Sequence, residues 1–367
     1  MAQLSLGFRE VGTASQIKHT MIGTLKREVV KLAEGSKLFR KIYCRMKRSK
    51  SLDFPAMVES RRSTSIFDLE TLSAPLPYYP VFYFDDCNYY GILNCLLTYC
   101  QVNIANAKLP LHQIYIEHGI VIGNLVRTDS VTLAKKTLTY SNYRAQYIAE
   151  KAKKTSVTIG PYIHYAESLL SESALNNIKK ELGRVLLVFP THSIAAVSSE
   201  YDQQEFCNEI ERRKAGFDTV LVCMYWKDAQ NGDHAAYENM GYKLTTAGHR
   251  DDLYFLNRLK SIIMLADMVI SNSTGTHVGY SLFLGKPNYL YKQDVSMVSK
   301  SKSGDTLLKN HYEPGVTTTK NRDNQMLYDA FNTFEERITD AQYELTNYIW
   351  GFDCVKTPEE MKAVLLA

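Results

Sequence analysis

The sequence predicts an α/β protein made of two successive units, each built on a parallel β-sheet. From Pro80 onward, short apolar runs of strand length alternate with segments of helical periodicity, and this alternation is typical of parallel strands joined by crossover helices. A second series of strands and helices starts at Arg184. At 367 residues the chain is also too long for one core and suits two domains of about 150 to 200 residues.

The composition is that of a globular protein, with 45% hydrophobic and 22% charged residues. The seven cysteines are odd in number and show no CxxC spacing, so reduced thiols in a cytoplasmic protein are expected rather than disulfides or a zinc site. No apolar run is long enough to cross a bilayer, and the N-terminus lacks the pattern of a secretion signal. The protein is therefore expected to be cytoplasmic.

The positive charge is concentrated near the N-terminus. Residues 17–50 contain eleven Lys and Arg against two Glu, which gives +9 there and −5 for the rest of the chain. A basic amphipathic helix can lie on an anionic membrane surface, so peripheral attachment to the inner membrane through 17–50 is one interpretation. A solvated helix packed on the protein is the other. Nucleic-acid binding is not expected, because no reader motif accompanies the charge.

Both units are expected to be Rossmann-like folds, with a cleft between them. In the first, strands are expected at 81–84, 113–116, 138–139 and 157–159, and helices at 90–100, 142–153 and 166–181. In the second, strands are expected at 185–189, 219–224, 243–245, 268–271 and 288–291, and helices at 201–214, 235–240, 253–265 and 278–284. Ligands of such sheets bind at the carboxyl ends of the strands.

The clearest ligand-binding pattern is the polar loop between the expected strand 268–271 and the helix after it. Its candidate binding residues are Ser271, Ser273, Thr274, Gly275 and Thr276. A glycine-containing turn that opens a helix presents free amides and the positive end of the helix dipole, which suits a phosphate. The alternative is an ordinary helix N-cap. Neither GxGxxG nor a P-loop occurs at a strand-to-helix junction, which argues against a dehydrogenase and a P-loop nucleotidase.

Two histidines follow other expected strands. His192, with Ser193 beside it, comes after strand 185–189 and can donate to a phosphate oxygen, or it can simply satisfy a neighbouring carbonyl. Glu117 and His118 follow strand 113–116, where either side chain could deprotonate a hydroxyl group. The alternative for this pair is an ion pair for Glu117 and a helix cap for His118.

Weaker candidates follow two further strands. Asp85, Asp86 and Asn88 could bind the hydroxyl groups of an acceptor, although such residues are also common in turns. Arg250 could meet a phosphate or a base, although the acidic residues after it make a normal helix start. No cluster has metal-ligand spacing, so metal-independent chemistry is expected.

Three short markers resemble those of the GT-B sialyltransferase-like and Kdo-transferase-like enzymes of bacterial capsule and lipopolysaccharide assembly. Here they read Glu117-His118-Gly119, Thr191-His192-Ser193 and Ser273-Thr274. The chain departs from the family pattern at His118, where the family has a second acidic residue, and at Ser193, where it has proline. The first departure leaves open which residue is the base, and the second weakens the inference of a CMP-linked donor.

The resemblance implies a GT-B glycosyltransferase that uses a nucleotide sugar as co-substrate, needs no other cofactor, and modifies a glycan or lipid-linked glycan. Glu117 would be the base, while His192, Ser273 and Thr274 would hold the donor phosphate. The charge and strand–helix patterns predict a basic extension and linker at 1–76, an acceptor-side domain at 77–182 and a donor-side domain at 183–340. The resemblance implies that the C-terminal segment 341–367 crosses back to the first domain. A nucleotide-sugar epimerase, a polyol-phosphate transferase and a non-catalytic membrane scaffold are the alternatives.

Overall fold

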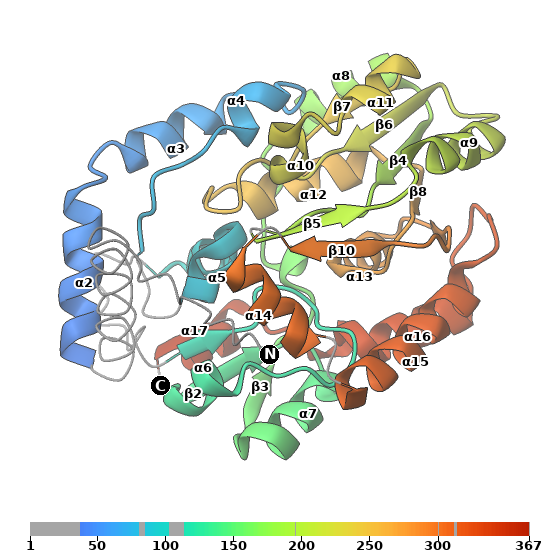
Figure 1. Ribbon diagram of the computed structural model, residues 1–367. Coiled ribbons are helices and arrows are strands. Elements are labelled where there is room, and N and C mark those ends of the chain that lie inside the picture. The colour runs from blue at the N-terminus through green and yellow to red at the C-terminus, as the bar shows by residue number, and fades with distance from the viewer. Residues whose placement is uncertain are drawn as a thin grey trace, which may run out of the picture.

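The computed structural model describes residues 37–80, 85–102, 114–194, 196–299, 301–311 and 314–366. Within them, the chain forms one parallel sheet from its first half and another from its second half, with helices around both (Figure 1). The predicted α/β class with two parallel sheets is confirmed. The expected strand 81–84 and the basic residues 17–36 lie outside the described residues.

The first sheet has three parallel strands in the order β1-β2-β3. The strands and the helices between and before them are β1 (Ile114–Ile116), β2 (Lys136–Thr139), β3 (Ser156–Thr158), η1 (Asp85–Gly91), α5 (Ile92–Tyr99), α6 (Thr128–Leu133) and α7 (Asn142–Ala152). All three residues of β1 are buried, which explains why their sequence is a continuous apolar run. The loop after β1 therefore begins with Glu117 at the carboxyl edge of this sheet.

The second sheet has five parallel strands in the order β7-β6-β4-β8-β9. Its strands are β4 (Val185–Phe189), β6 (Thr219–Cys223), β7 (Lys243–Thr245), β8 (Met268–Ser271) and β9 (Asn288–Leu290). Its helices are α8 (Glu172–Leu182), α9 (Gln203–Arg213), α10 (Trp226–Asn231), α11 (Ala235–Asn239), α12 (Phe255–Leu265) and α13 (Thr276–Phe283). The strand order reverses between β4 and β8, and ligands bind at such a switch point in open α/β sheets.

Two local predictions are wrong. The helix expected at 166–181 begins only at Glu172, because the Ser171 side chain accepts a hydrogen bond from the Ala174 amide and so caps the helix there. A two-stranded antiparallel ribbon of β5 (Val197–Glu200) and β10 (Ser296–Ser299) was not expected. These two strands are short and polar, so they lack the apolar run that identifies a buried strand.

Residues 49–76, part of the segment expected to be an extension and linker, form helices instead. After α2 (Lys37–Ser49), they form α3 (Phe54–Arg62) and α4 (Leu69–Ser73). These helices bury Phe54, Val58 and Leu72, and they belong with the second half of the chain. The hydroxyl of Thr245 on β7 donates to the carbonyl of Ile66 at 2.7 Å, and the Gln230 side chain donates to the carbonyl of Ser73 at 2.6 Å.

The C-terminal region from Lys302 onward is helical and contacts both halves. Its elements are α14 (Lys302–His311), α15 (Pro314–Phe331), α16 (Asp340–Trp350), η4 (Phe352–Cys354) and α17 (Pro358–Leu366). The Ser141 hydroxyl, at the start of α7, donates to the carbonyl of Ile349 at 2.6 Å. On the other side, α16 packs against α13, where Trp350 lies against Gly279.

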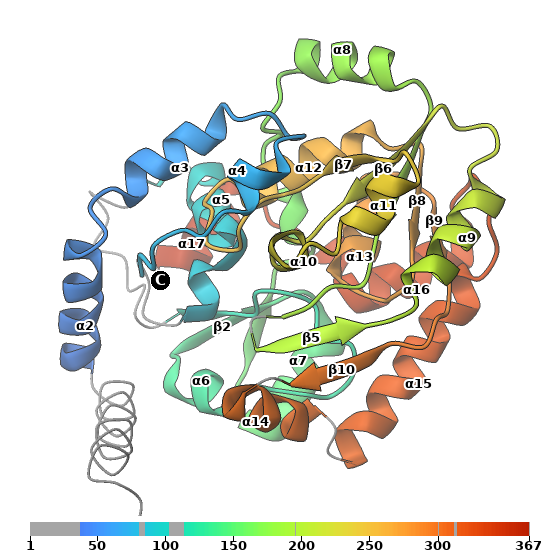
Figure 2. The same ribbon diagram turned by 45° about the horizontal axis from the view of Figure 1, so that its top comes forward.

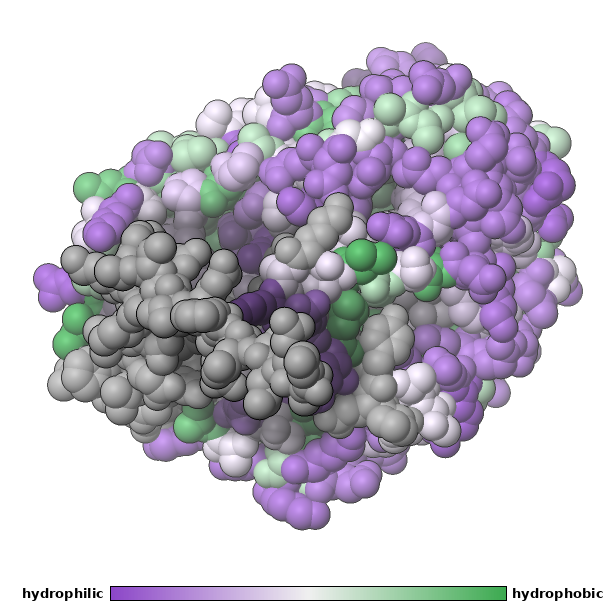
Figure 3. Space-filling model, in the orientation of Figure 1, coloured by the Kyte–Doolittle hydropathy of each residue, from purple (hydrophilic) through white to green (hydrophobic). Residues whose placement is uncertain are grey.

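The surface seen in Figure 3 is mostly hydrophilic around α9, and hydrophobic side chains gather near β10 in the middle of this face. Among the described residues, none of the helices has the length and apolar character needed to span a membrane.

Candidate functional site

The loops that follow β4 and β8 lie side by side at the switch point of the second sheet. The amide of Thr191, after β4, donates to the side-chain oxygen of Asn272, after β8, at 2.7 Å. The other end of the Asn272 side chain donates to Gln293 at 2.9 Å. The structure thus brings together the His192 loop and the Ser273 loop, which are about 80 residues apart in the sequence.

The loop before α13 has fewer free groups than its sequence suggests. The Thr274 hydroxyl donates to the Asn324 side chain at 2.7 Å, and Thr276 Oγ1 accepts a hydrogen bond from the Ile120 amide at 3.1 Å. Ser271 is fully buried, and its hydroxyl donates to the Ser273 carbonyl. Gly275 stands at the N-cap and makes no side-chain cap. The amides at the start of α13 are the donors left for an anion.

His192 and Ser193, after β4, have different surroundings. His192 is exposed, its ring centroid lies 4.3 Å from that of Tyr225, and its Nδ1 is 3.0 Å from the Ser193 carbonyl. Ser193 is 1% exposed, and its amide donates to both oxygens of Asp228 at 3.1 Å. The His192 side chain can therefore contact a ligand, whereas Ser193 is buried beneath the surface and cannot.

A pocket of about 370 Å³ opens beside His192 at the carboxyl ends of β4 and β6. It is lined by the loops after these strands, by β5 and by the start of α9 (Pro190, Thr191, His192, Ser199, Glu200, Tyr201, Asp202, Gln203, Met224, Tyr225, Asp228 and Asp233). Its volume is in the range of small-molecule sites. Four carboxylate residues make its wall acidic.

Glu117 lies in a buried ion pair rather than in an open cleft. Its Oε1 is 2.7 Å from Arg144 Nη2, its Oε2 is 3.3 Å from Arg144 Nε, and Thr139 also donates to Oε2 at 2.5 Å. Glu117 is 5% exposed, and the Arg144 side chain is fully buried. The same guanidinium donates to the carbonyls of Gly123 and Leu125. Both carboxylate oxygens are thus occupied by donors, and the ion pair that was the alternative for Glu117 is the arrangement that the structure shows.

His118 lies among aromatic side chains of η1. Its ring centroid is 5.3 Å from that of Tyr89 and 5.9 Å from that of Tyr90. The Tyr90 hydroxyl in turn lies 3.1 Å from the Tyr225 hydroxyl, which belongs to the lining of the pocket. The imidazole of His118 is half-buried, so it is closer to the setting expected of a base than Glu117 is.

Arg250 joins this group from the loop after β7. Its guanidinium lies 4.6 Å from the Tyr89 ring centroid, and its backbone carbonyl accepts a hydrogen bond from the Tyr90 amide at 2.6 Å. Its Nε is buried without a hydrogen-bond partner among the described residues. The neighbouring His249 is kept neutral, because burial lowers its pKa to about 4, with further contributions from Arg250 and Arg61.

His277 is a residue that the sequence reasoning missed, although it directly follows the Ser273 loop. Its ring stacks on Phe189 at 4.9 Å, and its Nε2 is buried without a hydrogen-bond partner among the described residues. Burial, together with a smaller contribution from the nearby His192, lowers the pKa of His277 to about 3. The imidazole is therefore neutral and lies between the β4 and β8 loops.

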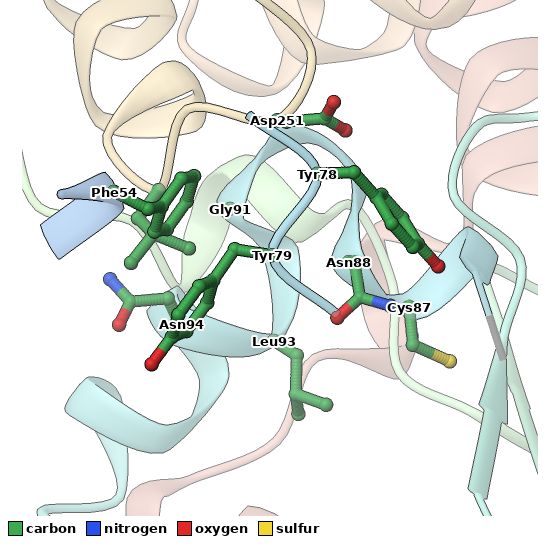
Figure 4. Close-up of a pocket in the computed structure, with 10 residues that line it drawn as sticks. Phe54, Tyr78, Tyr79, Cys87, Asn88, Gly91, Leu93, Asn94 and Asp251 are labelled. Atoms are coloured by element: carbon green, nitrogen blue, oxygen red, sulfur yellow. The ribbon is translucent and has the colours of Figure 1, made fainter. Parts of the chain in front are cut away.

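Of the three residues predicted to bind the acceptor, only Asn88 has a side chain within the described part of the structure. Asp85 and Asp86 lie in η1, and their side chains lie outside the described part of the structure. Asn88 lines a hollow of about 20 Å³, which is large enough for a water molecule, beside Tyr78 and opposite Tyr79 (Figure 4). Across the described ranges, no three His, Cys, Asp or Glu side chains are grouped so that they could hold a metal ion.

No protein-family model matches the chain, and no curated protein matches it. Among solved structures, the chain is similar to one described as the structure of the wall teichoic acid polymerase TagF. The sequence identity is 11% and the TM-score 0.37, over 72% of this chain and 69% of that chain. A likeness at this level assigns neither a family nor an activity to the chain.

Proposed function

We propose that the protein is a GT-B glycosyltransferase that moves a sugar from a nucleotide-activated donor to an acceptor hydroxyl group. The observation that carries the proposal is the meeting of strand-end loops from both sheets beside a pocket. The Ile120 amide of the first half bonds Thr276 of the second, and Tyr90 bonds Tyr225. A transferase needs both substrates to meet between its halves, and such loops are where α/β enzymes place their chemistry.

In this proposal the donor phosphate lies near His192 and the start of α13. The imidazole of His192 and the first amides of α13 are the hydrogen-bond donors, with Ser273 beside them. Arg250 supplies a positive charge near Tyr225, which lines the pocket. These groups would stabilise the negative charge that develops on the departing nucleotide.

We propose that the nucleoside of the donor binds in the pocket beside His192, because the lining of this pocket is acidic. Carboxylates such as Glu200, Asp202 and Asp233 would repel a phosphate, but they can accept hydrogen bonds from ribose hydroxyls and from a base with an amino group. The cytosine of a CMP-linked nonulosonate or Kdo donor fits these acceptors. We propose such donors first, and other nucleotide sugars as the alternative.

We propose His118 as the base. It would take the proton of the acceptor hydroxyl while the acceptor oxygen forms the new bond to the anomeric carbon. The bond from that carbon to the donor phosphate oxygen would break, and the nucleotide would leave with its electron pair. The ion pair with Arg144 favours His118 over Glu117 in this role, because both oxygens of Glu117 already accept hydrogen bonds.

The described part of the basic segment supports attachment to an anionic membrane, where a lipid-linked glycan acceptor would be found. On α2, Ile42 and Met46 are 54% and 49% exposed, and Leu52, just after it, is 80% exposed. Residues four apart share one face of a helix. Arg45, Lys47 and Arg48 add charge to this helix, and each cation contributes on the order of 1 kcal/mol at an anionic surface.

A thermal-shift screen tests the proposed function. CMP, CDP, UDP, GDP and dTDP would be added to the protein and to its His192→Ala and Ser273→Ala variants. A ligand at about 100 times its Kd stabilises the native state by about 2.7 kcal/mol, so one nucleotide should raise Tm in the parent protein and less in the variants. If none of the nucleotides raises Tm, the proposal fails.

Product analysis with the matching nucleotide sugar then separates the remaining reactions. A glycosyltransferase releases the nucleotide only when an acceptor is present. An epimerase needs no acceptor, and a polyol-phosphate transferase leaves phosphate in the product.

A further inference from the structure

Two adjacent residues of α15 each connect to a loop of the candidate site. One connects to the loop before α13, and the other to the loop after β1, which contains His118. Asn324 accepts the hydrogen bond from Thr274 in the loop before α13. Asp323 accepts one from Tyr143, whose hydroxyl contacts the loop that contains His118. Successive residues on a helix point about 100° apart, so one helix can reach two different loops. Figure 2 shows α15 beside α16 at the lower right of the molecule.

On the donor side, α15 holds Thr274 through one hydrogen bond. The Thr274 hydroxyl donates to Asn324 Oδ1 at 2.7 Å. Tyr328, one turn further along α15, lies near the Thr274 backbone, and burial raises the pKa of that tyrosine. The position of the Ser273 loop is therefore set by α15 as well as by its own sheet.

On the His118 side, the connection passes through Tyr143 of α7. The Tyr143 hydroxyl donates to Asp323 Oδ2 at 2.7 Å and accepts from the Gly123 amide at 2.5 Å. Asp323 is 3% exposed, so this bond is shielded from water. Gly123 has a φ of +94°, and a Cβ there would lie 2.9 Å from the Cα of Lys320 on α15. The close approach of the loop to α15 thus requires glycine.

We infer that α15 is a positioning element, in which Asn324 sets the donor loop and Asp323, through Tyr143, sets the loop that carries His118. The functional part of this inference rests on the proposed function. The inference predicts that the two loops can be loosened one at a time. Loss of the Asn324 hydrogen bond should loosen the loop before α13, and loss of the Tyr143 hydroxyl should loosen the loop after β1.

Hydrogen exchange on the unliganded protein tests the positioning itself. Asn324→Ala should accelerate amide exchange in residues 271–278 by about fivefold to tenfold and leave 121–126 unchanged, since one partly buried hydrogen bond is lost. The Ile120 amide is left out of the comparison, because it donates to Thr276. Tyr143→Phe, which keeps the ring, should do the reverse. Asn321→Ala, at an exposed position of α15, is the matched control and should change neither segment. Equal acceleration of both loops by either variant, or none, would overturn the inference.

Nucleotide binding and turnover test the functional consequence. Asn324→Ala should weaken binding of the nucleotide found in the thermal-shift screen, whereas Tyr143→Phe should lower kcat and leave nucleotide Kd within about twofold of the parent. If the parent protein binds no nucleotide, the proposed function is wrong, but hydrogen exchange still decides the role of α15. If the parent protein is active and both variants change Kd and kcat alike, α15 supports the fold without positioning the loops separately.

Discussion

Arg144 donates two hydrogen bonds to Glu117 and two more to carbonyls of the loop that follows Glu117. One buried guanidinium thus fixes both the carboxylate and the path of the chain past His118. Burying a charged pair is costly unless every group is satisfied, and here Thr139 supplies the remaining contact to the carboxylate. The pair is therefore a structural element next to the proposed base.

Glu117→Gln tests this assignment. The substitution keeps the size of the side chain but leaves the Arg144 charge buried without a counter-ion, so we expect a loss of about 3 to 5 kcal/mol in the free energy of unfolding. Urea unfolding measures it, and Glu150→Gln on the exposed face of α7 is the control. A variant of unchanged stability that had lost all transferase activity would instead support Glu117 as the base.

The stability of the protein should fall with acid in a way that depends on His249. Burial lowers the pKa of His249 to about 4, below the value of about 6.5 in an unfolded chain. The unfolded chain then binds more protons between these pH values, so the stability contributed by neutral His249 is full above pH 6.5 and is lost as pH falls toward 4.

His249→Gln, which does not titrate, should reduce this slope by up to about 1.4 kcal/mol per pH unit. Unfolding curves at pH 7, 6, 5 and 4 measure the slope for both proteins. The buried His277 remains in both and cancels from the comparison. Parallel pH profiles for the parent and the variant would contradict the neutral state of His249.

Gly279→Ala tests the packing of the C-terminal segment on the second half. A Cβ at this position would overlap the indole ring of the fully buried Trp350, so α16 would have to move away from α13. We expect a loss of about 1 to 3 kcal/mol by urea unfolding, as for other overpacked cores. Gly315→Ala is the matched control, because a Cβ there would meet nothing within 4 Å. Equal stability of the two variants would contradict the described packing.

Membrane attachment by α2 predicts that both its apolar and its basic side chains matter. Ile42→Ser with Met46→Ser, and separately Arg45→Glu with Arg48→Glu, should each weaken binding to phosphatidylglycerol-containing vesicles at least about tenfold. Leu133→Ser, which alters an exposed leucine of α6, is the control. Co-sedimentation measures the binding. Undiminished binding of both double variants would exclude α2 as the anchor.

The sequence was most informative where strands are buried on both faces. Val185–Phe189 is entirely buried, and its continuous apolar run identified both the strand and the loop that carries His192. The same reasoning could not find β5 and β10, because Val197–Glu200 has a single buried residue. Nor could it show that α3 and α4 pack on the second half, since that contact depends on hydrogen bonds between distant residues.

The candidate site was predictable as a set of loops but not as a set of contacts. Strand order alone brings Thr191 next to Asn272, so the loops after β4 and β8 could be expected to meet. The partner of Glu117, by contrast, is Arg144 on α7, beyond α6 and β2, and the partner of Thr274 is Asn324, 50 residues away. Nothing in the local sequence identifies these partners. An ion pair for Glu117 was therefore one of two open alternatives, and the hydrogen bond of Thr274 was not predicted.

The most direct test of the account compares His118→Ala with His192→Ala, using calorimetry for nucleotide binding and product analysis for transfer. We expect His118→Ala to keep nucleotide affinity and to lose about 10²- to 10⁴-fold in turnover, and we expect His192→Ala to lose nucleotide affinity. If His118→Ala transfers sugar at the parent rate, or if His192→Ala binds nucleotide as tightly as the parent, the proposed division of roles between the two loops is wrong.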